Sequence, residues 1–136
     1  MLNTIEEPLG KYYVKLDRRL FDFSIAVIKT MRQLPNNPES KVIHYQLTKS
    51  VTSAGANYEE AQAASSKLDF RNKIYISLKE IRETNYWLRI INELELLDKT
   101  EIQPLLDESV ELKKIFGSIT AKLDKKRKAS STNDKV

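Results

Sequence analysis

The stretch Ser50–Ala61, SVTSAGANYEEA, decides the fold, because it places small residues in the middle of an amphipathic helix. Ile43 and Leu47 recur upstream at helical spacing, and Ser50 and Ala54 continue the same stripe at about 100° per residue. A leucine-sized side chain at these positions would hold a neighbouring helix away. The small residues therefore predict a narrow waist, where a second helix approaches this one closely.

Start and stop signals divide the chain into four predicted helices. Pro35 ends the first, and Asn37-Pro38 supplies a cap and a first-turn proline for the second, which runs to about Ala64. Ser66 with Asp69 resembles a capping box before the third, and Thr100-Glu101-Ile102-Gln103 is a capping-box pattern that opens the fourth. The predicted apolar stripes are, in order, Leu16, Leu20, Phe23, Val27, Met31 and Leu34; Ile43, Leu47, Ser50, Ala54, Tyr58 and Ala61; Phe70, Ile74, Leu78, Ile81, Asn85 and Leu88; and Leu105, Leu112, Phe116, Ile119 and Leu123.

Short links between long helices favour antiparallel neighbours. We therefore predict an all-α fold, an up-down-up-down antiparallel four-helix bundle that occupies residues 1–123. The end of the chain, KKRKASSTNDKV, has no apolar periodicity. Residues 124–136 are accordingly predicted to form a basic, disordered tail.

Composition excludes several classes of protein. The absence of cysteine excludes disulfides and thiolate sites and fits a reducing compartment. The first ten residues, MLNTIEEPLG, are acidic and lack the apolar core of a signal peptide. No apolar run approaches the roughly 18 residues that would span a bilayer. We expect a soluble cytoplasmic protein of bacterial type that does not contact membranes.

The net charge of +4 is polarised along the chain. From Lys122 onward there are six basic residues against two acidic ones, which equals the whole net charge, whereas residues 1–121 hold 17 of each sign. Within residues 93–121, seven acidic residues face three basic ones. Polarity of this kind serves either nucleic-acid binding or complementarity between subunits.

Two predicted helices have a second uncharged side that a monomeric bundle would leave in water. On the second helix, Thr52, Ala56 and Ala63 lie nearly opposite the core stripe. The third helix has a corresponding apolar cluster, which consists of Ile76, Trp87, Ile90 and Leu94. Apolar patches of this size mark interfaces, so we predict a homo-oligomer with these four residues in the contact.

Basic and aromatic residues alternate within one arc of the third predicted helix. We call this set the arginine–tyrosine stripe: Arg71, Tyr75, Lys79, Arg82, Tyr86 and Arg89. Guanidinium groups pair with phosphates, and tyrosines stack on unpaired bases, so the stripe is a candidate nucleic-acid site. The alternative is a solvated face whose arginines pair with Glu83, Glu93 or the acidic fourth helix of a neighbouring subunit.

Catalytic residues are scarce. His44 is the only histidine, and without cysteine the common nucleophile–base pairs are missing. Ser50 and Ser53 are better explained as small packing residues than as nucleophiles. The Glu-x-x-His motifs of di-iron bundles and the glycine-rich phosphate loop are also absent. The sequence predicts no catalytic residues, no metal site and no cofactor, and hence a protein that is not an enzyme.

Two long segments resemble a known family. KSVTSAGANYEEAQAASSKLDFRNKIYISLKEIRETNYWLRII (49–91), with LDRRLFDFSIAVIKTMRQLP (16–35) upstream, resembles the bacterial proteins associated with intervening sequences in 23S ribosomal RNA genes. The likeness covers roughly residues 11–121. The family pattern often has isoleucine before the glycine, where this chain has Ala54. This family is similar to the accessory variability determinant proteins of diversity-generating retroelements.

The resemblance implies a four-helix bundle, assembly into a homopentamer, and association with RNA or DNA. We therefore expect a non-catalytic, homo-oligomeric module that associates with nucleic acid, RNA in particular. A nucleic-acid-processing protein is a further expected partner. The rival hypothesis is a protein–protein scaffold or adaptor whose basic faces meet only protein.

Overall fold

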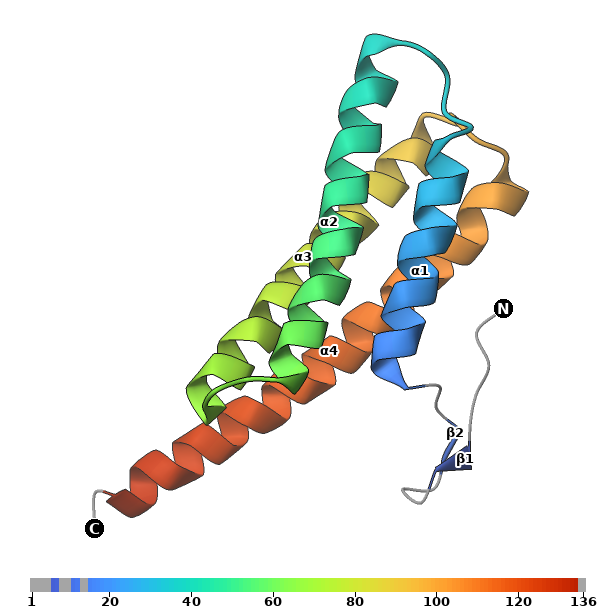
Figure 1. The fold of residues 1–136 in the computed structure, drawn as a ribbon. Coiled ribbons are helices and arrows are strands. Elements are labelled where there is room, and N and C mark those ends of the chain that lie inside the picture. The colour runs from blue at the N-terminus through green and yellow to red at the C-terminus, as the bar shows by residue number, and fades with distance from the viewer. Residues whose placement is uncertain (1–5, 8–10, 13–14, 135–136) are drawn as a thin grey trace.

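Four helices make up almost all of the described chain. The computed structural model describes residues 6–7, 11–12 and 15–134, and side chains for residues 15–129. The helices are α1 (Leu16–Met31), α2 (Pro38–Gln62), α3 (Lys67–Glu93) and α4 (Lys99–Asp134), shown in Figure 1. Strands β1 (Glu6–Glu7) and β2 (Lys11–Tyr12) pair antiparallel in a short ribbon before α1. The predicted all-α fold is confirmed.

The helices follow one another around the bundle. Each helix packs on the next one in the chain, and α4 also packs on α1 (Figure 1). Within the described residues the backbones of α1 and α3, and of α2 and α4, do not come close, and α2 meets α4 across the core through side chains, where the Tyr58 ring contacts Phe116. This arrangement is the predicted up-down-up-down bundle.

The predicted apolar stripes form the core. Most of their residues are buried, while Leu16, Leu34, Tyr58, Phe70, Ile119 and Leu123 are partly buried and pack against it. Residues outside those stripes complete the core, among them Val51, Ile91, Ile102 and Leu106. The ring of Tyr58 meets Phe116 edge-on at 5.8 Å, and burial raises the pKa of this tyrosine.

The predicted caps hold for two helices and fail for the third. The Asn37 side chain accepts from the Ser40 N–H at 2.9 Å, and the Ser66 hydroxyl accepts from the Asp69 N–H at 3.0 Å. The capping-box prediction at Thr100 is wrong. Helix α4 begins at Lys99, where the Asp98 carbonyl accepts the first backbone hydrogen bonds, so Thr100 already lies inside the helix.

The narrow waist is confirmed at both neighbours of α2. On the α3 side, the Ser77 hydroxyl donates to the backbone carbonyl of Ala54 at 2.9 Å, a contact that requires close approach. On the α1 side, a Cβ built on Gly55 would lie 3.8 Å from the Leu20 Cβ and 3.7 Å from the Ser24 hydroxyl. Small residues in α2 therefore allow two helices to pack closely on it.

A layer of hydrogen-bonded polar side chains crosses the buried interior. Ser50 of α2 and Thr84 of α3 share a hydrogen bond of 2.9 Å, and the Asn85 amide donates to the Ser109 hydroxyl of α4 at 2.9 Å. All four residues are buried. Because buried polar groups must be paired, this layer specifies how the three helices align along their lengths.

The C-terminal segment differs from the prediction. Helix α4 continues through Asp134 and extends beyond the α2–α3 loop in Figure 1, where the sequence analysis expected a disordered tail from residue 124. The prediction relied on the lack of apolar periodicity after Leu123. It overlooked Asp124, whose carboxylate binds α3 and holds this part of α4 against the bundle. The last two residues, 135–136, lie outside the described chain.

Candidate nucleic-acid interface

The arginine–tyrosine stripe follows the side of α3 that turns toward α4. Helical spacing brings its six residues onto one arc, as predicted, but the structure divides them into two groups. Arg71 and Tyr75 bind the C-terminal part of α4. The other four residues are exposed, and we call them the exposed stripe: Lys79, Arg82, Tyr86 and Arg89.

Arg71, Tyr75 and Asp124 form a compact cluster between α3 and α4. The Arg71 guanidinium donates to the Asp124 carboxylate at 2.7 Å, the Tyr75 hydroxyl donates to its other oxygen, and the guanidinium lies 4.6 Å from the centre of the Tyr75 ring. These bonds lower the pKa of Asp124, the Tyr75 hydroxyl having the larger effect and Arg71 the next. The same bond raises the pKa of Tyr75.

The cluster reduces what this end of the stripe can offer a ligand. Arg71 pairs with a carboxylate of α4 in the same chain, which is neither Glu83 nor Glu93 nor the fourth helix of a neighbouring subunit. An arginine and a tyrosine that are both bound to Asp124 have fewer donors to offer a ligand. In this structure Arg71 and Tyr75 join α3 to α4.

The exposed stripe has no carboxylate partner among residues 15–129. Lys79 and Arg82 form no ion pair there, and Arg89 donates its Nε hydrogen to the neutral amide oxygen of Asn85 at 3.0 Å. The Arg89 guanidinium lies 5.7 Å from the centre of the Tyr86 ring, and this ring is 49% exposed. The stripe thus offers three unneutralised cations around one accessible aromatic ring.

The predicted oligomer face lies on the side of α3 that turns toward α2. Trp87 and Ile90 are partly buried and pack against the core of their own chain, Ile76 is half-buried, and Leu94 is 55% exposed. The Trp87 indole N–H donates to Glu83 at 3.2 Å, and its ring meets Tyr86 edge-on at 5.2 Å. The chain itself therefore covers part of this apolar cluster, and Leu94 is its most accessible member.

Sequence reasoning missed a buried ion pair. Arg19 of α1 binds Glu108 of α4 through two hydrogen bonds of 2.8 Å each, and the two side chains are only 19% and 11% exposed. Hydrogen bonding to Glu108 raises the pKa of Arg19. The pair stabilises the seam between the first and last helices. No local pattern points to it, because its two residues are far apart in the chain.

The described part of the chain contains no cluster of three or more potential metal ligands. Within the same part, no helix is long and apolar enough to cross a membrane. His44 is half-buried on α2 and has no carboxylate or histidine partner there.

Comparison with known proteins identifies the family. The family model described as 23S rRNA-intervening sequence protein matches residues 15–118, which include three whole helices and most of α4. The chain belongs to the 23S rRNA-intervening sequence protein family. The resemblance inferred from the two long segments is confirmed, and no curated protein matches the chain.

A solved structure supports the same assignment. A protein of unknown function from the S23 ribosomal protein family of Bacteroides thetaiotaomicron VPI-5482 is 32% identical to this chain. The match covers 77% of this chain and 97% of that one, with a TM-score of 0.71. The range matched by the 23S rRNA-intervening sequence protein model contains the whole arginine–tyrosine stripe. It ends before Asp124 and the basic residues that follow, so the cluster between α3 and α4 includes a residue outside the shared domain.

Proposed function

We propose that this protein is a non-catalytic, homo-oligomeric module that associates with nucleic acid, RNA in particular, through the exposed stripe. The observation that carries the proposal is the absence of any carboxylate partner for Lys79, Arg82 and Arg89 within residues 15–129. Cations that no nearby acid neutralises attract phosphate, and releasing counterions from the nucleic acid favours binding.

The aromatic residue in the stripe favours RNA with unpaired bases over a regular duplex. The half-exposed ring of Tyr86 can stack on a base that is splayed out of a helix, whereas a paired base is already stacked on both faces. The family name and the name of the solved relative both refer to ribosomal RNA or the ribosome, which supports RNA as the ligand. A nucleic-acid-processing protein in the cytoplasm is the further partner that we propose for such a module.

Self-association would multiply weak contacts. A second copy that covers Leu94 and the accessible parts of Ile76, Trp87 and Ile90 would bury apolar surface that is now in water. The family resemblance suggests a pentamer. In such an assembly each RNA molecule would meet several stripes, and modest phosphate contacts would act together.

The test compares RNA and DNA ligands at several salt concentrations. By fluorescence anisotropy, a labelled RNA hairpin with single-stranded ends should bind more tightly than duplex DNA of equal length. The variant Arg82→Gln/Arg89→Gln should bind more weakly, with a salt slope reduced by about 0.7 for each phosphate contact removed. The matched control Arg18→Gln/Lys114→Gln also removes two exposed positive charges, on other faces, and should bind as the wild type does.

Two further variants separate the sources of affinity. Tyr86→Ala should weaken binding by about tenfold with little change in salt slope, because stacking releases few ions. Deletion of residues 125–136 should leave most of the binding intact, and loss of all affinity on deletion would assign binding to the basic end of α4 instead. A wild-type protein with no salt-sensitive binding to either ligand at low ionic strength would favour the scaffold function.

A further inference from the structure

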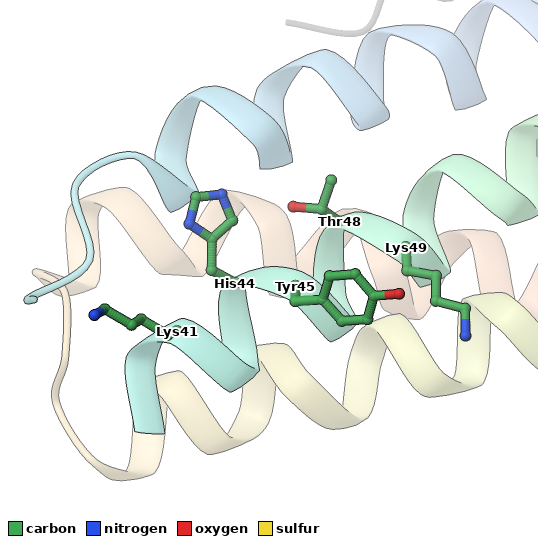
Figure 2. Close-up of a pocket in the computed structure, with 5 residues that line it drawn as sticks. All are labelled: Lys41, His44, Tyr45, Thr48 and Lys49. Atoms are coloured by element: carbon green, nitrogen blue, oxygen red, sulfur yellow. The ribbon is translucent and has the colours of Figure 1, made fainter. Parts of the chain in front are cut away.

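A second candidate site lies on the outer surface of α2, away from the arginine–tyrosine stripe. A hollow of about 420 Å³ is lined by Lys41, His44, Tyr45, Thr48 and Lys49 (Figure 2). His44 and Thr48 lie on the side of α2 that faces α1, and Tyr45 extends beside Lys49 (Figure 2). All five residues come from α2, so the hollow is shallow and open to solvent.

The parts of α1 and α2 around the hollow are basic, although acidic residues of α3 and α4 lie at the same end of the bundle, where Glu101 of α4 accepts from Gln33 of α1 at 3.5 Å. Between residues 23 and 58, Glu39 is the only carboxylate, against Lys29, Arg32, Lys41 and Lys49. All four cations are exposed, and none forms an ion pair within residues 15–129. This end of the α1–α2 hairpin is therefore suited to an anionic ligand.

The aromatic residue in the hollow repeats the arrangement of the exposed stripe. Tyr45 is 64% exposed and Tyr86 is 49% exposed, and they are the two exposed tyrosines among residues 15–129. Lys41 and Lys49 lie four residues before and after Tyr45, just as Arg82 lies four before Tyr86. Each ring therefore has cations one turn away on the same face of its helix.

The spacing of the two lysines favours a strand over a single anion. Residues eight apart in a helix are separated by a rise of about 12 Å, and Figure 2 shows the two ammonium groups directed away from each other on either side of Tyr45. One phosphate would not contact both groups in this arrangement. Phosphates two nucleotides apart in an extended strand span about this distance, so such a stretch, with one of its bases stacked on Tyr45, matches the order of cation, ring and cation.

The hollow and the exposed stripe lie at one level of the bundle. Ser50 of α2 meets Thr84 of α3, and the two helices run antiparallel. Tyr45 lies five residues before Ser50, and Arg89 lies five residues after Thr84, so these two residues are at the same level along the bundle. Tyr86 is within one turn of that level. An RNA strand that meets both tyrosines crosses the outer side of α3, where Trp87 and Leu94 lie, so a second copy packed on those residues would have to leave this path open.

We propose that the hollow on α2 binds a short single-stranded RNA segment, with one base on Tyr45 and two phosphates, two nucleotides apart, on Lys41 and Lys49. The inference rests on the proposed function, since it supplies a second contact for the same ligand. The probe is a labelled twelve-nucleotide oligouridine, rU12, and its binding is measured by anisotropy at several salt concentrations. Uridine monophosphate serves as the competitor that represents a free nucleotide.

A two-by-two design separates this proposal from the proposed function. Tyr45→Ala should weaken rU12 binding by about tenfold, whereas Tyr45→Phe, which keeps the ring, should bind as the wild type does. Lys41→Gln/Lys49→Gln should reduce the salt slope by about 0.7 for each contact, and Arg18→Gln/Lys114→Gln should not. In the Arg82→Gln/Arg89→Gln background, the remaining affinity should fall again when Tyr45 is changed to alanine.

The outcomes distinguish the two sites. If the α3 variants weaken binding while the α2 variants do not, the hollow is not an RNA site and the proposed function stands. If the α2 variants alone weaken binding, RNA binds at the hollow and not at the exposed stripe. The substitutions at Tyr45, Lys41 and Lys49 could instead change the mass of the assembly and leave RNA affinity unchanged. That result would show that this face is an interface between copies, and it would overturn the proposal. If uridine monophosphate competes as strongly as unlabelled rU12, the ligand of the hollow is a free nucleotide and not an RNA strand.

Discussion

Replacing Gly55 should change stability in opposite directions, depending on the size of the new side chain. An alanine Cβ at this position would lie 3.7 Å from the Ser24 hydroxyl and 3.8 Å from the Leu20 Cβ, which are ordinary van der Waals distances. Gly55→Ala should therefore stabilise the protein by about 0.5–1 kcal/mol, the usual gain when alanine replaces glycine within a helix. Gly55→Leu adds three more carbon atoms toward α1, and overpacking of this kind costs about 1–3 kcal/mol.

Gly117 provides the matched control. It lies within α4, and nothing stands within 4 Å of a Cβ built there. Gly117→Ala and Gly117→Leu should both gain helix propensity without meeting a neighbour, so neither should destabilise the protein. The difference between the two leucine variants isolates the packing against α1, and we expect it to be about 2 kcal/mol.

Urea unfolding, followed by circular dichroism at one fixed protein concentration, measures all four variants. A fixed concentration matters because assembly would shift the apparent stability by mass action. With a slope of about 2 kcal/mol per molar urea, the expected difference moves the midpoint by about 1 M. If Gly55→Leu proves as stable as Gly117→Leu, α1 does not pack closely on α2, and the explanation of the small residues is wrong.

Three further predictions follow from the other contacts. Leu94→Glu should give smaller species in light scattering while the helical circular-dichroism signal persists, and a wild type that is already monomeric at micromolar concentration would contradict the oligomer. Glu108→Gln should lower the free energy of unfolding in urea by about 2 kcal/mol because it leaves Arg19 partly buried without its counter-charge, and an unchanged midpoint would show that the pair contributes nothing. Because the pKa of Asp124 is lowered in the folded protein, its bonds stabilise the fold above pH 3.8, and this stabilisation is lost as the pH falls through the folded pKa. Because the pKa of Tyr75 is raised, its bond stabilises the fold below pH 10.0, and this stabilisation is lost as the pH rises through the folded pKa. In a phenolate absorbance titration, Asp124→Asn should therefore make one tyrosine ionise at lower pH than in the wild type, and identical curves would contradict the bond.

The sequence predicted the architecture well because local signals determined it. Apolar periodicity, the prolines and the caps at Asn37 and Ser66 all act within one helix or its ends, and they placed the helices and most of the core. The start of α4 was misplaced because Thr100 matches a capping pattern, whereas the helix begins one residue earlier, after Asp98. Two candidate cap residues only two positions apart are difficult to rank without the surrounding structure.

The candidate site was predicted only in part. Contacts between helices divide the arginine–tyrosine stripe into a paired group and an exposed group, and the sequence does not show those contacts. Helical spacing placed six residues on one arc of α3, but it did not show that Asp124 would bind two of them. The α2 hollow was missed because, of the residues that line it, only His44 was considered, and only as a catalytic group. The repeated pattern of cation and tyrosine around Tyr45 was nevertheless present in the sequence and could have revealed it.

The hydrogen-bonded layer of Ser50, Thr84, Asn85 and Ser109 limits how this bundle can move. A shear of α3 past both neighbours by one turn, about 5.4 Å, would separate both pairs, whereas a shear of α2 or of α4 past α3 would separate one. The hydroxyls keep bonds to carbonyls of their own helices, but the buried Asn85 amide would lose its acceptor, at a cost of about 1–3 kcal/mol. Ratchet-like sliding is therefore disfavoured among α2, α3 and α4. The position of Tyr45 on α2 relative to Tyr86 on α3 is therefore expected to stay nearly fixed.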